Sequence, residues 1–271
     1  MDVSIVIPVF NQLTYTTNCL KSLNDAGIPD SRVTIVNNAS TDGTTEFLAA
    51  RPQIRAVNNP ENRGCGCAWT QGAKISGTTW TLLMNNDVLV PPGCIEGLIS
   101  FAEERKFDIV SPAMCEGEED YDFPAHAADF MRRLRDAFRR DVAHGVAFLV
   151  HRRVFDAIGY FDGDPKLGGY EDDEYFRRAR GAGFCIAITG RAFLHHFGSI
   201  TQKSIQAKSG QLRKSLGDRE YYRRKTGQTW FKRKIQQVKH TVRSAYWKRS
   251  ELKCFGRTLW EKRVGGRSDF F

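Results

Sequence analysis

Two groups of carboxylates stand where a folded chain could use them for chemistry. The largely apolar run at residues 80–84 ends abruptly in Asn-Asn-Asp at 85–87, and the glycine pair at 168–169 is followed closely by four acids at 171–174. A carboxylate at a strand end can hold Mg²⁺ or Mn²⁺ through one or two oxygens, with a diphosphate and water as further ligands. A carboxylate presented by a glycine turn can take a proton from a hydroxyl. We therefore expect a metal ligand at Asp87 and a base within the acidic group.

Both carboxylate groups also have a structural explanation. Asp87 could simply begin a turn, and acids favour the first turn of a helix because the helix dipole is positive there. We assign Asp173 and Glu174 to such a helix start. The local sequence does not separate Glu171 from Asp172 as the base.

Two adjacent histidines end the last apolar segment before residue 200. His195 and His196 precede Phe-Gly-Ser at 197–199, so either ring would lie at a strand end. Imidazole is a common metal ligand. A single histidine more often packs in the core, but two in a row before Gly-Ser favour completion of the metal site.

Polar residues follow other expected strands as well. Side-chain amides and carboxylates at these points can read the edge of a nucleobase, and the helix start at Gly64 offers unpaired N–H groups to phosphate or ribose. Open α/β sheets bind ligands at the carboxyl ends of their strands. We therefore expect a donor-nucleotide site made by Pro8, Val9, Asn11, Asn37, Asn38, Asp42, Asn62, Gly64, Asn85 and Asn86. Asp42 also suits a helix cap, which is the structural alternative.

The elements that must position these residues alternate between strand and helix. Short apolar runs separated by helical patterns predict a mostly parallel sheet with helices on both faces, built from β-α-β units. The predicted strands are 3–9, 32–36, 54–57, 79–84, 108–111, 145–150, 185–188 and 192–195, and the predicted helices are 13–25, 44–50, 65–76, 93–104, 153–158 and 172–182. Residues 115–141 interrupt this alternation with a helix candidate at 127–140, and we interpret them as a substrate-covering insertion.

The net charge of +9 hides a strong asymmetry. Residues 1–200 carry 20 Lys and Arg against 26 Asp and Glu, whereas residues 201–271 carry 20 against 5, a net charge of +15. We predict a catalytic domain at 1–200 and a basic, helical extension at 201–271. Phe231, Ile235, Val238, Val242 and Ala245 recur at helical spacing within the extension. Such a helix could meet an anionic membrane surface, a nucleic acid, another subunit, or only solvent.

Composition limits the classes of protein that the chain could be. Mean hydropathy is −0.43 and no apolar run approaches the roughly 20 residues of a membrane span, which argues against an integral membrane protein. A strand begins almost at the first residue, and seven cysteines show no disulfide framework. We expect a cytoplasmic protein, with peripheral contact to the inner membrane face as an open alternative.

Residues 1–199 resemble the family 2 glycosyltransferases, and within them the bacterial rhamnosyltransferase-like branch. Seven segments carry the resemblance in the family's order: SIVIPVFN, VNNASTDGT, NRGCGCAWTQG, LLMNNDVLVPPG, GVAFLVHRRVFDAIGYFD, GYEDDEYFRRARGAGF and HHFGS. The resemblance implies a GT-A fold, a UDP- or dTDP-sugar donor, Mn²⁺ or Mg²⁺ as cofactor, and inversion at the anomeric carbon. It also implies that Asp87 and His195 bind the metal, with His196 as second choice, and that Asp172 is the base beside Glu171.

Two positions depart from the family's pattern. Asn37 stands where an aspartate usually contacts the nucleobase, and Gln71 replaces a common asparagine in the helix after the NRG segment. The family's pattern therefore assigns the nucleobase and sugar contacts less firmly than it assigns the metal ligand and the general base.

The resemblance predicts sugar transfer to an acceptor hydroxyl on a bacterial cell-surface saccharide or lipid-linked glycan. The basic extension leaves open a nucleic-acid acceptor such as a modified DNA base, and a protein acceptor is a further alternative. A nucleotide-sugar binding protein without turnover is a rival of another class. A nucleotidyltransferase is disfavoured, because the segment after the first strand (VFNQL) is neither glycine-rich nor basic.

Overall fold

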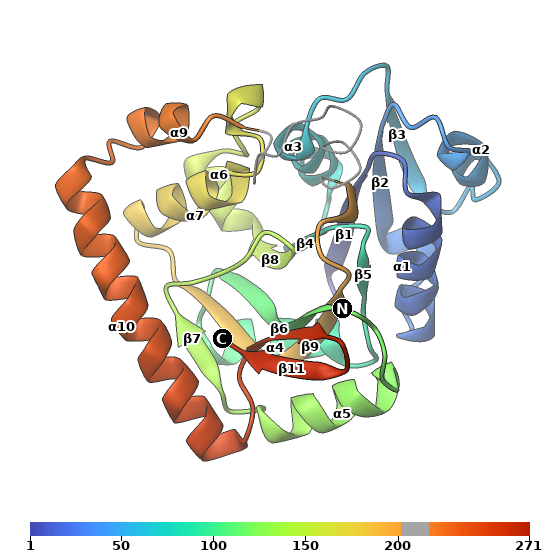
Figure 1. The fold of residues 1–271 in the computed structure, drawn as a ribbon. Helices are drawn as coiled ribbons and strands as arrows, with labels where there is room; N and C mark the ends of the chain where they lie inside the picture. The colour runs from blue at the N-terminus through green and yellow to red at the C-terminus, as the bar shows by residue number, and fades with distance from the viewer. Residues whose placement is uncertain (202–216) are drawn as a thin grey trace.

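The computed structural model describes residues 1–201 and 217–271. Its N-terminal half is a parallel sheet in the order β3-β2-β1-β4 (Figure 1). The strands are β1 (Val3–Val9), β2 (Val33–Asn38), β3 (Arg55–Asn59) and β4 (Trp80–Met84). The intervening helices are α1 (Leu13–Asp25), α2 (Thr44–Ala49) and α3 (Cys65–Ile75), with a short 3₁₀ turn η1 (Asp30–Arg32). The predicted alternation of strands and helices is confirmed here. It arises because each apolar run is long enough for one strand, and each helix returns the chain to the edge where the next parallel strand begins.

Beyond β4 the sheet is mixed rather than mostly parallel. Strand β8 (Ala147–His151) lies between β4 and β6 (Ile109–Gly117) and runs antiparallel to both. Strand β9 (Ile186–His196) pairs in parallel with β6, while the short strands β5 (Val88–Leu89) and β7 (Phe138–Arg140) pair antiparallel with β9. The helices of this half are α4 (Cys94–Arg105), α5 (Phe123–Arg133), α6 (Arg152–Ile158) and α7 (Glu171–Gly181), with the 3₁₀ turn η2 (Pro165–Leu167).

One predicted helix and two predicted strands differ from the structure. The helix expected at 127–140 ends at Arg133, and Phe138–Arg140 form β7 instead. The two strands expected at 185–188 and 192–195 are one strand, β9, with a register shift opposite Pro112 and Ala113 of β6. Gly190 allows this irregularity, because a Cβ atom there would lie only 2.2 Å from the Leu134 carbonyl oxygen.

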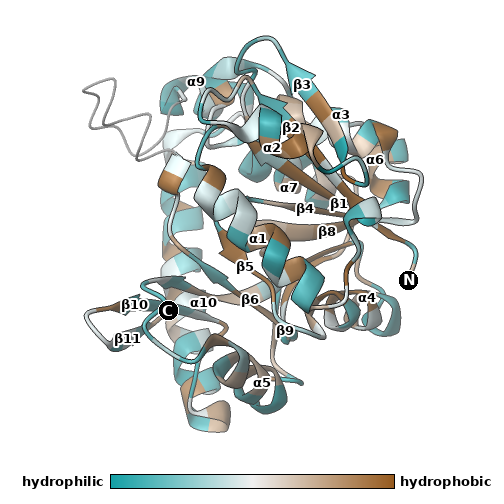
Figure 2. Cartoon of the chain, turned by 90° about the vertical axis from the view of Figure 1, so that its right-hand side faces the viewer, coloured by the Kyte–Doolittle hydropathy of each residue, from teal (hydrophilic) through white to brown (hydrophobic). Residues whose placement is uncertain are grey.

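The sheet is covered on both faces by apolar helix surfaces. Alternate residues of β1 serve different layers: Ile5 packs with α1 and α4, while Val6 packs with α3. A third apolar cluster lies between α5 and β9. Figure 2 shows hydrophobic strands such as β1 and β2 inside, with hydrophilic helix surfaces outside. This packing holds the carboxyl ends of β1, β2 and β4 side by side.

The C-terminal segment, as described over residues 217–271, contains two helices, α9 (Arg219–Lys225) and α10 (Trp230–Phe255), and two strands, β10 (Trp260–Val264) and β11 (Arg267–Phe270). Helices were expected here, and strands were not. Strand β10 pairs in parallel with β6, and β11 forms the outer edge of the sheet. Helix α10 runs along the outside of the molecule (Figure 1). Within residues 1–201 and 217–271, no helix is long and apolar enough to cross a membrane.

A buried ion pair fixes α10 to the sheet. Arg139 of β7 donates to both carboxylate oxygens of Glu251 at 2.7 and 2.8 Å, and also to the Phe271 carbonyl at 2.6 Å. Glu251 in turn accepts the Leu259 N–H at 2.9 Å. Both charged side chains are buried. The bidentate geometry and the extra backbone partners offset the cost of removing these charges from water.

We expect Glu251→Gln to lower the free energy of unfolding by about 3 kcal/mol, because it leaves the buried Arg139 guanidinium without its counter-charge. Urea unfolding followed by circular dichroism measures this loss. Asp25→Asn is the matched control, since it breaks the exposed Lys21–Asp25 pair and should cost about 0.5 kcal/mol or less. Equal effects of the two substitutions would contradict an anchoring role for the buried pair.

Candidate active site

A cleft with a volume of about 740 Å³ opens at the carboxyl ends of β1, β2 and β4. Ten of the predicted site residues line it: Pro8, Val9, Asn38, Asn62, Gly64, Asn85, Asn86, Asp87, Glu171 and Asp172. They come from strands and loops far apart in the sequence, which meet because the parallel strands end at one edge. Among the described residues that line the cleft, none belongs to 115–141, and a covering role for that segment stays a prediction.

Three predicted nucleotide-binding residues lie outside the cleft wall. The Asn37 side chain is buried and donates to Thr45 and Asn58 at 3.0 Å each. Asn11 accepts the Thr41 N–H at 2.7 Å. Asp42 accepts the N–H of Leu13 at 2.9 Å and the hydroxyl of Thr44 at 2.6 Å, which matches its structural alternative. These bonds join the turns that follow β1 and β2.

Asp87 is buried and fixed by partners from the end of β9. One carboxylate oxygen accepts the Ile200 N–H at 3.0 Å, and the other lies 3.5 Å from Nε2 of His196. The opposite ring nitrogen of His196 lies 3.8 Å from Glu116. Burial would lower the pKa of His196, but the carboxylates of Asp87 and Glu116 raise it to about 9. The His196 ring and the Asp87 carboxylate are therefore electrostatically coupled.

The geometry places His196, the second choice, rather than His195 beside Asp87, while metal binding by either histidine stays a prediction. Consecutive residues of a strand face opposite sides of the sheet. The ring of His195 points away from Asp87, and its Nδ1 lies 2.8 Å from the Tyr121 hydroxyl. Phe123 and Phe197 pack around the same ring. Segment 115–141 thus contributes Tyr121 to the support of β9, and the second-choice His196 faces the cleft residue.

The structure separates Glu171 from Asp172. The Glu171 side chain is buried and accepts the Gly169 N–H at 2.6 Å, so it closes the glycine turn before α7. Asp172 is half-buried and lines the cleft. Burial, together with the neighbouring charges of Asp173 and Glu171, raises the pKa of Asp172 to about 7. A carboxylate with a pKa near neutrality suits proton transfer in either direction.

Gly145 leaves the space that the Asp172 carboxylate occupies. A Cβ atom at position 145 would lie 2.2 Å from Oδ2 of Asp172. The loop before β8 can therefore approach α7 only with glycine here. Any side chain at this position would displace the carboxylate or the loop.

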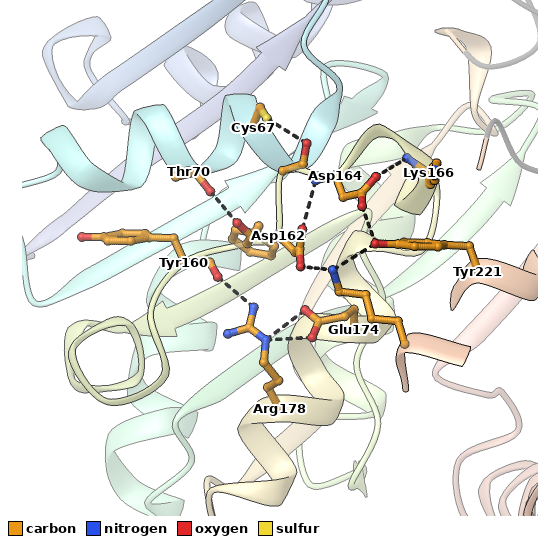
Figure 3. Close-up of polar contacts among 12 residues, drawn as sticks. Cys67, Thr70, Tyr160, Asp162, Asp164, Lys166, Glu174, Arg178 and Tyr221 are labelled. Carbon is orange, nitrogen blue, oxygen red and sulfur yellow. Dashed lines mark hydrogen bonds and ion pairs between the residues drawn. The ribbon is translucent and has the colours of Figure 1, made fainter. Parts of the chain in front are cut away.

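The rim of the cleft is held by the C-terminal segment, which sequence reasoning missed. Lys225 of α9 pairs with Asp162 at 2.5 Å, and the Tyr221 hydroxyl donates to Asp164 (Figure 3). The rings of Tyr170 and Tyr222 stack with centroids 5.0 Å apart. No local pattern predicts these contacts, because α9 is more than 50 residues from the rim in the sequence.

Helix α7 holds the chain that leads into the cleft rim, at residues 158–160. Arg178 binds both oxygens of Glu174 at 2.8 and 2.9 Å, as Figure 3 shows. Its other nitrogens donate to the carbonyls of Ile158 and Tyr160 at 2.7 and 2.8 Å. Glu174, predicted to serve only the helix start, therefore also orients the arginine that ties α7 to the rim segment.

The residues around Asp87 fit a metal that is only partly held by protein. In the part of the chain that the structure describes, no three His, Cys, Asp or Glu side chains form a closed metal-binding group. Asp87 lines the cleft, and the His196 ring lies 3.5 Å from its carboxylate, so the pair offers one carboxylate and one imidazole. Mg²⁺ and Mn²⁺ often bind through one or two protein ligands, with phosphate oxygens and water completing the coordination shell. The donor set is compatible with such an ion.

Comparison with known proteins gives a consistent result. The family model described as glycosyl transferase family 2 matches residues 4–159. Glycosyltransferase AglE of Haloferax volcanii is 25% identical over 240 residues, which cover 82% of this chain and 77% of that protein. Undecaprenyl-phosphate mannosyltransferase of Micrococcus luteus is 34% identical over 94 residues, covering 33% of this chain and 36% of that protein.

Solved structures share the fold at low sequence identity. S. aureus TarS, residues 1–349, aligns with a TM-score of 0.56 and 16% identity over 72% of this chain and 60% of that chain. Mannosyltransferase PcManGT from Pyrobaculum calidifontis, solved with GDP-Man and Mn²⁺, aligns with a TM-score of 0.55 and 17% identity over 72% of this chain and 56% of that chain. The aligned region is thus about 60% or less of each solved chain, and the predicted GT-A fold is confirmed.

We expect Lys225→Met to loosen the rim, because it removes the ion pair to Asp162. A partly exposed pair of this kind contributes about 1 kcal/mol or less, so amide exchange across residues 162–170 should quicken by up to about fivefold. Hydrogen exchange read by mass spectrometry measures the change. Lys21→Met is the control, since Lys21 pairs only with Asp25 on α1. Unchanged exchange at the rim in Lys225→Met would contradict a clamping role for α9.

Proposed function

Because the chain belongs to glycosyl transferase family 2, and is therefore a glycosyltransferase, we propose that it moves a sugar from a nucleoside diphosphate donor to an acceptor hydroxyl with inversion. The observation that carries this proposal is the position of Asp172 and Asp87 in one cleft, the first half-buried with a raised pKa and the second buried beside His196. One carboxylate is suited to accept a proton and the other to face a cation.

The proposed donor is a UDP- or dTDP-sugar. TarS has been solved with UDP and with UDP-GlcNAc, and PcManGT with GDP-Man, which supports a nucleotide-sugar donor as a class. In this proposal the carboxyl end of β1 (Pro8 and Val9), the glycine start of α3 and the Asn85-Asn86 pair contact the nucleotide and its phosphates. Membership of the rhamnosyltransferase-like branch remains a prediction from the sequence.

In the proposed reaction Asp172 accepts the proton of the acceptor hydroxyl as its oxygen bonds to the anomeric carbon. The bond from that carbon to the diphosphate breaks, and its electron pair leaves with the nucleoside diphosphate. The attack comes from the side opposite the leaving group, which inverts the anomeric configuration. Glu171 takes no part in the proton transfer, since its carboxylate holds the Gly169 N–H.

A divalent metal would be held by Asp87 and His196 in this proposal. When bound, such an ion neutralises charge on a leaving diphosphate. The Mn²⁺ present in the PcManGT structure supports a divalent cofactor, and Mn²⁺ or Mg²⁺ fits the donor atoms here. Asp87 itself is kept in position by the Ile200 N–H.

The proposed acceptor is a lipid-linked or cell-surface saccharide. The name of the Micrococcus luteus relative, an undecaprenyl-phosphate mannosyltransferase, supports a lipid-linked acceptor. We also propose that residues 1–200 contain the catalytic groups and that residues 201–271 serve as their support, because α9 clamps the cleft rim.

Asp172→Asn should lower the transfer rate at pH 8 by at least about 100-fold, since general base catalysis contributes roughly 10² to 10⁴. Donor binding should survive, seen as an unchanged thermal shift with UDP- or dTDP-sugar and Mn²⁺. Asp173→Asn is the matched control, because its exposed side chain lies next in the chain and should change the pH 8 rate by less than about threefold. A rate within about tenfold of the parent for Asp172→Asn would exclude this residue as the base. A thermal shift seen only with GDP-sugars would exclude uracil or thymine as the nucleobase of the donor.

The pH profile should report the same carboxyl group. We expect kcat/KM to fall about tenfold for each unit below about pH 7, because protonated Asp172 cannot accept the acceptor proton. Asp173→Asn should move this midpoint to lower pH, since the charge of Asp173 helps to raise the pKa of Asp172. Asp156→Asn, an exposed acid on α6, should leave the midpoint in place. If the midpoint of the kcat/KM profile does not move in Asp173→Asn, a group other than Asp172 titrates.

A further inference from the structure

Helix α10 presents an apolar face that its own chain leaves uncovered in the described residues. Six large hydrophobic side chains on this helix are between 56% and 72% exposed. They are Trp230, Phe231, Ile235, Val238, Val242 and Tyr246. Only Glu251, near the other end of the helix, is buried. Contiguous exposed apolar surface of this kind marks an interaction site.

The apolar face points away from the protein body. Phe231, Ile235, Val238 and Val242 follow one another at intervals of four, three and four residues, so they form one stripe along the helix. The opposite side carries the contacts with the sheet, where Glu251 binds Arg139 and the Trp247 ring lies 5.2 Å from the same guanidinium. The anchor of the helix therefore fixes the direction of the stripe.

Positive charge surrounds the stripe. Residues 221–250 contain ten Lys and Arg and no Asp or Glu. On a helical projection Lys232 and Lys239 border one edge of the stripe, and Lys234 and Lys248 border the other. An apolar stripe with basic residues on both sides is typical of a helix that lies in the interface of an anionic membrane.

We propose that α10 docks this protein on an anionic lipid surface, with the axis of the helix parallel to the membrane and the stripe Phe231-Ile235-Val238-Val242 inserted among the lipids. The Lys and Arg side chains at its edges contact the lipid phosphates. A helix of 26 residues is about 39 Å long, so all of the stripe meets the surface at once. The docking needs neither the donor nor the acceptor.

Two other occupants fit these observations less well. A second copy of the helix would bring eight Lys and Arg side chains against the same eight, and the one acid of α10, Glu251, is already bound to Arg139, so charge repulsion opposes pairing. A nucleic acid would match the charge, but Ile235, Val238 and Val242 have no ring that could stack on a base. Insertion into lipid accounts for the charge and the aliphatic centre together.

Docking through α10 would bring the cleft to the membrane. Helix α9 ends at Lys225, which binds Asp162 on the cleft rim, and α10 begins only a few residues later at Trp230. The rim is thus linked to the docked helix by a short segment, from 226 to 229. An acceptor anchored in the same lipid layer would meet the cleft without leaving the surface.

Vesicle flotation of the full chain at 150 mM salt tests the proposal. Parent protein should bind vesicles of 30% phosphatidylglycerol in phosphatidylcholine and bind pure phosphatidylcholine at least about tenfold more weakly. Val238→Asp/Val242→Asp and Lys232→Glu/Lys239→Glu should each lower binding to the anionic vesicles by about tenfold or more. Ile75→Asp, an exposed apolar residue on α3, and Lys262→Glu/Arg267→Glu, exposed charges on β10 and β11, should change binding by less than about threefold.

Three results would overturn the proposal. The first is a parent protein that does not float with anionic vesicles. The second is binding that survives Val238→Asp/Val242→Asp, which would mean that charge alone acts, as it would with nucleic acid in a parallel duplex shift assay. The third is a parent protein that does not bind vesicles but sediments as a dimer, with Val238→Asp/Val242→Asp sedimenting as a monomer. Circular dichroism and the donor-induced thermal shift of each variant show that it is folded, and neither readout depends on lipid.

Discussion

Negative charge collected in a partly closed cleft is the constraint around which this structure is arranged. Burial makes an ionised carboxylate unfavourable unless a partner compensates for the lost water. Three of the acids that line the cleft have different partners. Asp87 faces His196 and the Ile200 N–H, and Glu171 accepts the Gly169 N–H. Asp172 is left beside like charges, which together with burial raise its pKa. His196 and the Ile200 N–H thus keep the pKa of Asp87 low despite its burial, whereas burial raises the pKa values of Glu171 and Asp172.

Much of the fold was predictable because local pattern and final position agree. Strand β1 has apolar residues on both faces, and the structure buries both. The cleft residues at strand ends were predictable for the same reason. The histidine was not, because His195 and His196 differ only by one position in register, and one residue decides which face a side chain occupies. The partners of Asn37 lie on α2 and β3, which no short-range pattern specifies. Strand β10 carries the charged sequence WEKRV and becomes a strand because β6 offers it a pairing edge.

The C-terminal segment has a larger structural role than its composition suggested. The family model covers residues 4–159, yet Asp172, His196 and the rim clamp all lie beyond it. Lys225 and Tyr221 reach back to Asp162 and Asp164, and Glu251 reaches back to Arg139. The helical surface and the cleft are therefore mechanically connected through one stretch of chain, so that the site depends on residues that carry none of its chemistry.

The pairing of β10 with β6 has a consequence for the chain during synthesis. Residues 114–117 of β6 pair with β10, which is made only after more than 140 further residues of the chain. Until β10 arrives, this part of β6 presents free N–H and C=O groups to any other strand, and such open edges promote association between chains. A chain without residues 260–271 would carry its catalytic groups together with an unpaired sheet edge at β6. The hairpin of β10 and β11 therefore protects the molecule against aggregation as well as extending the sheet.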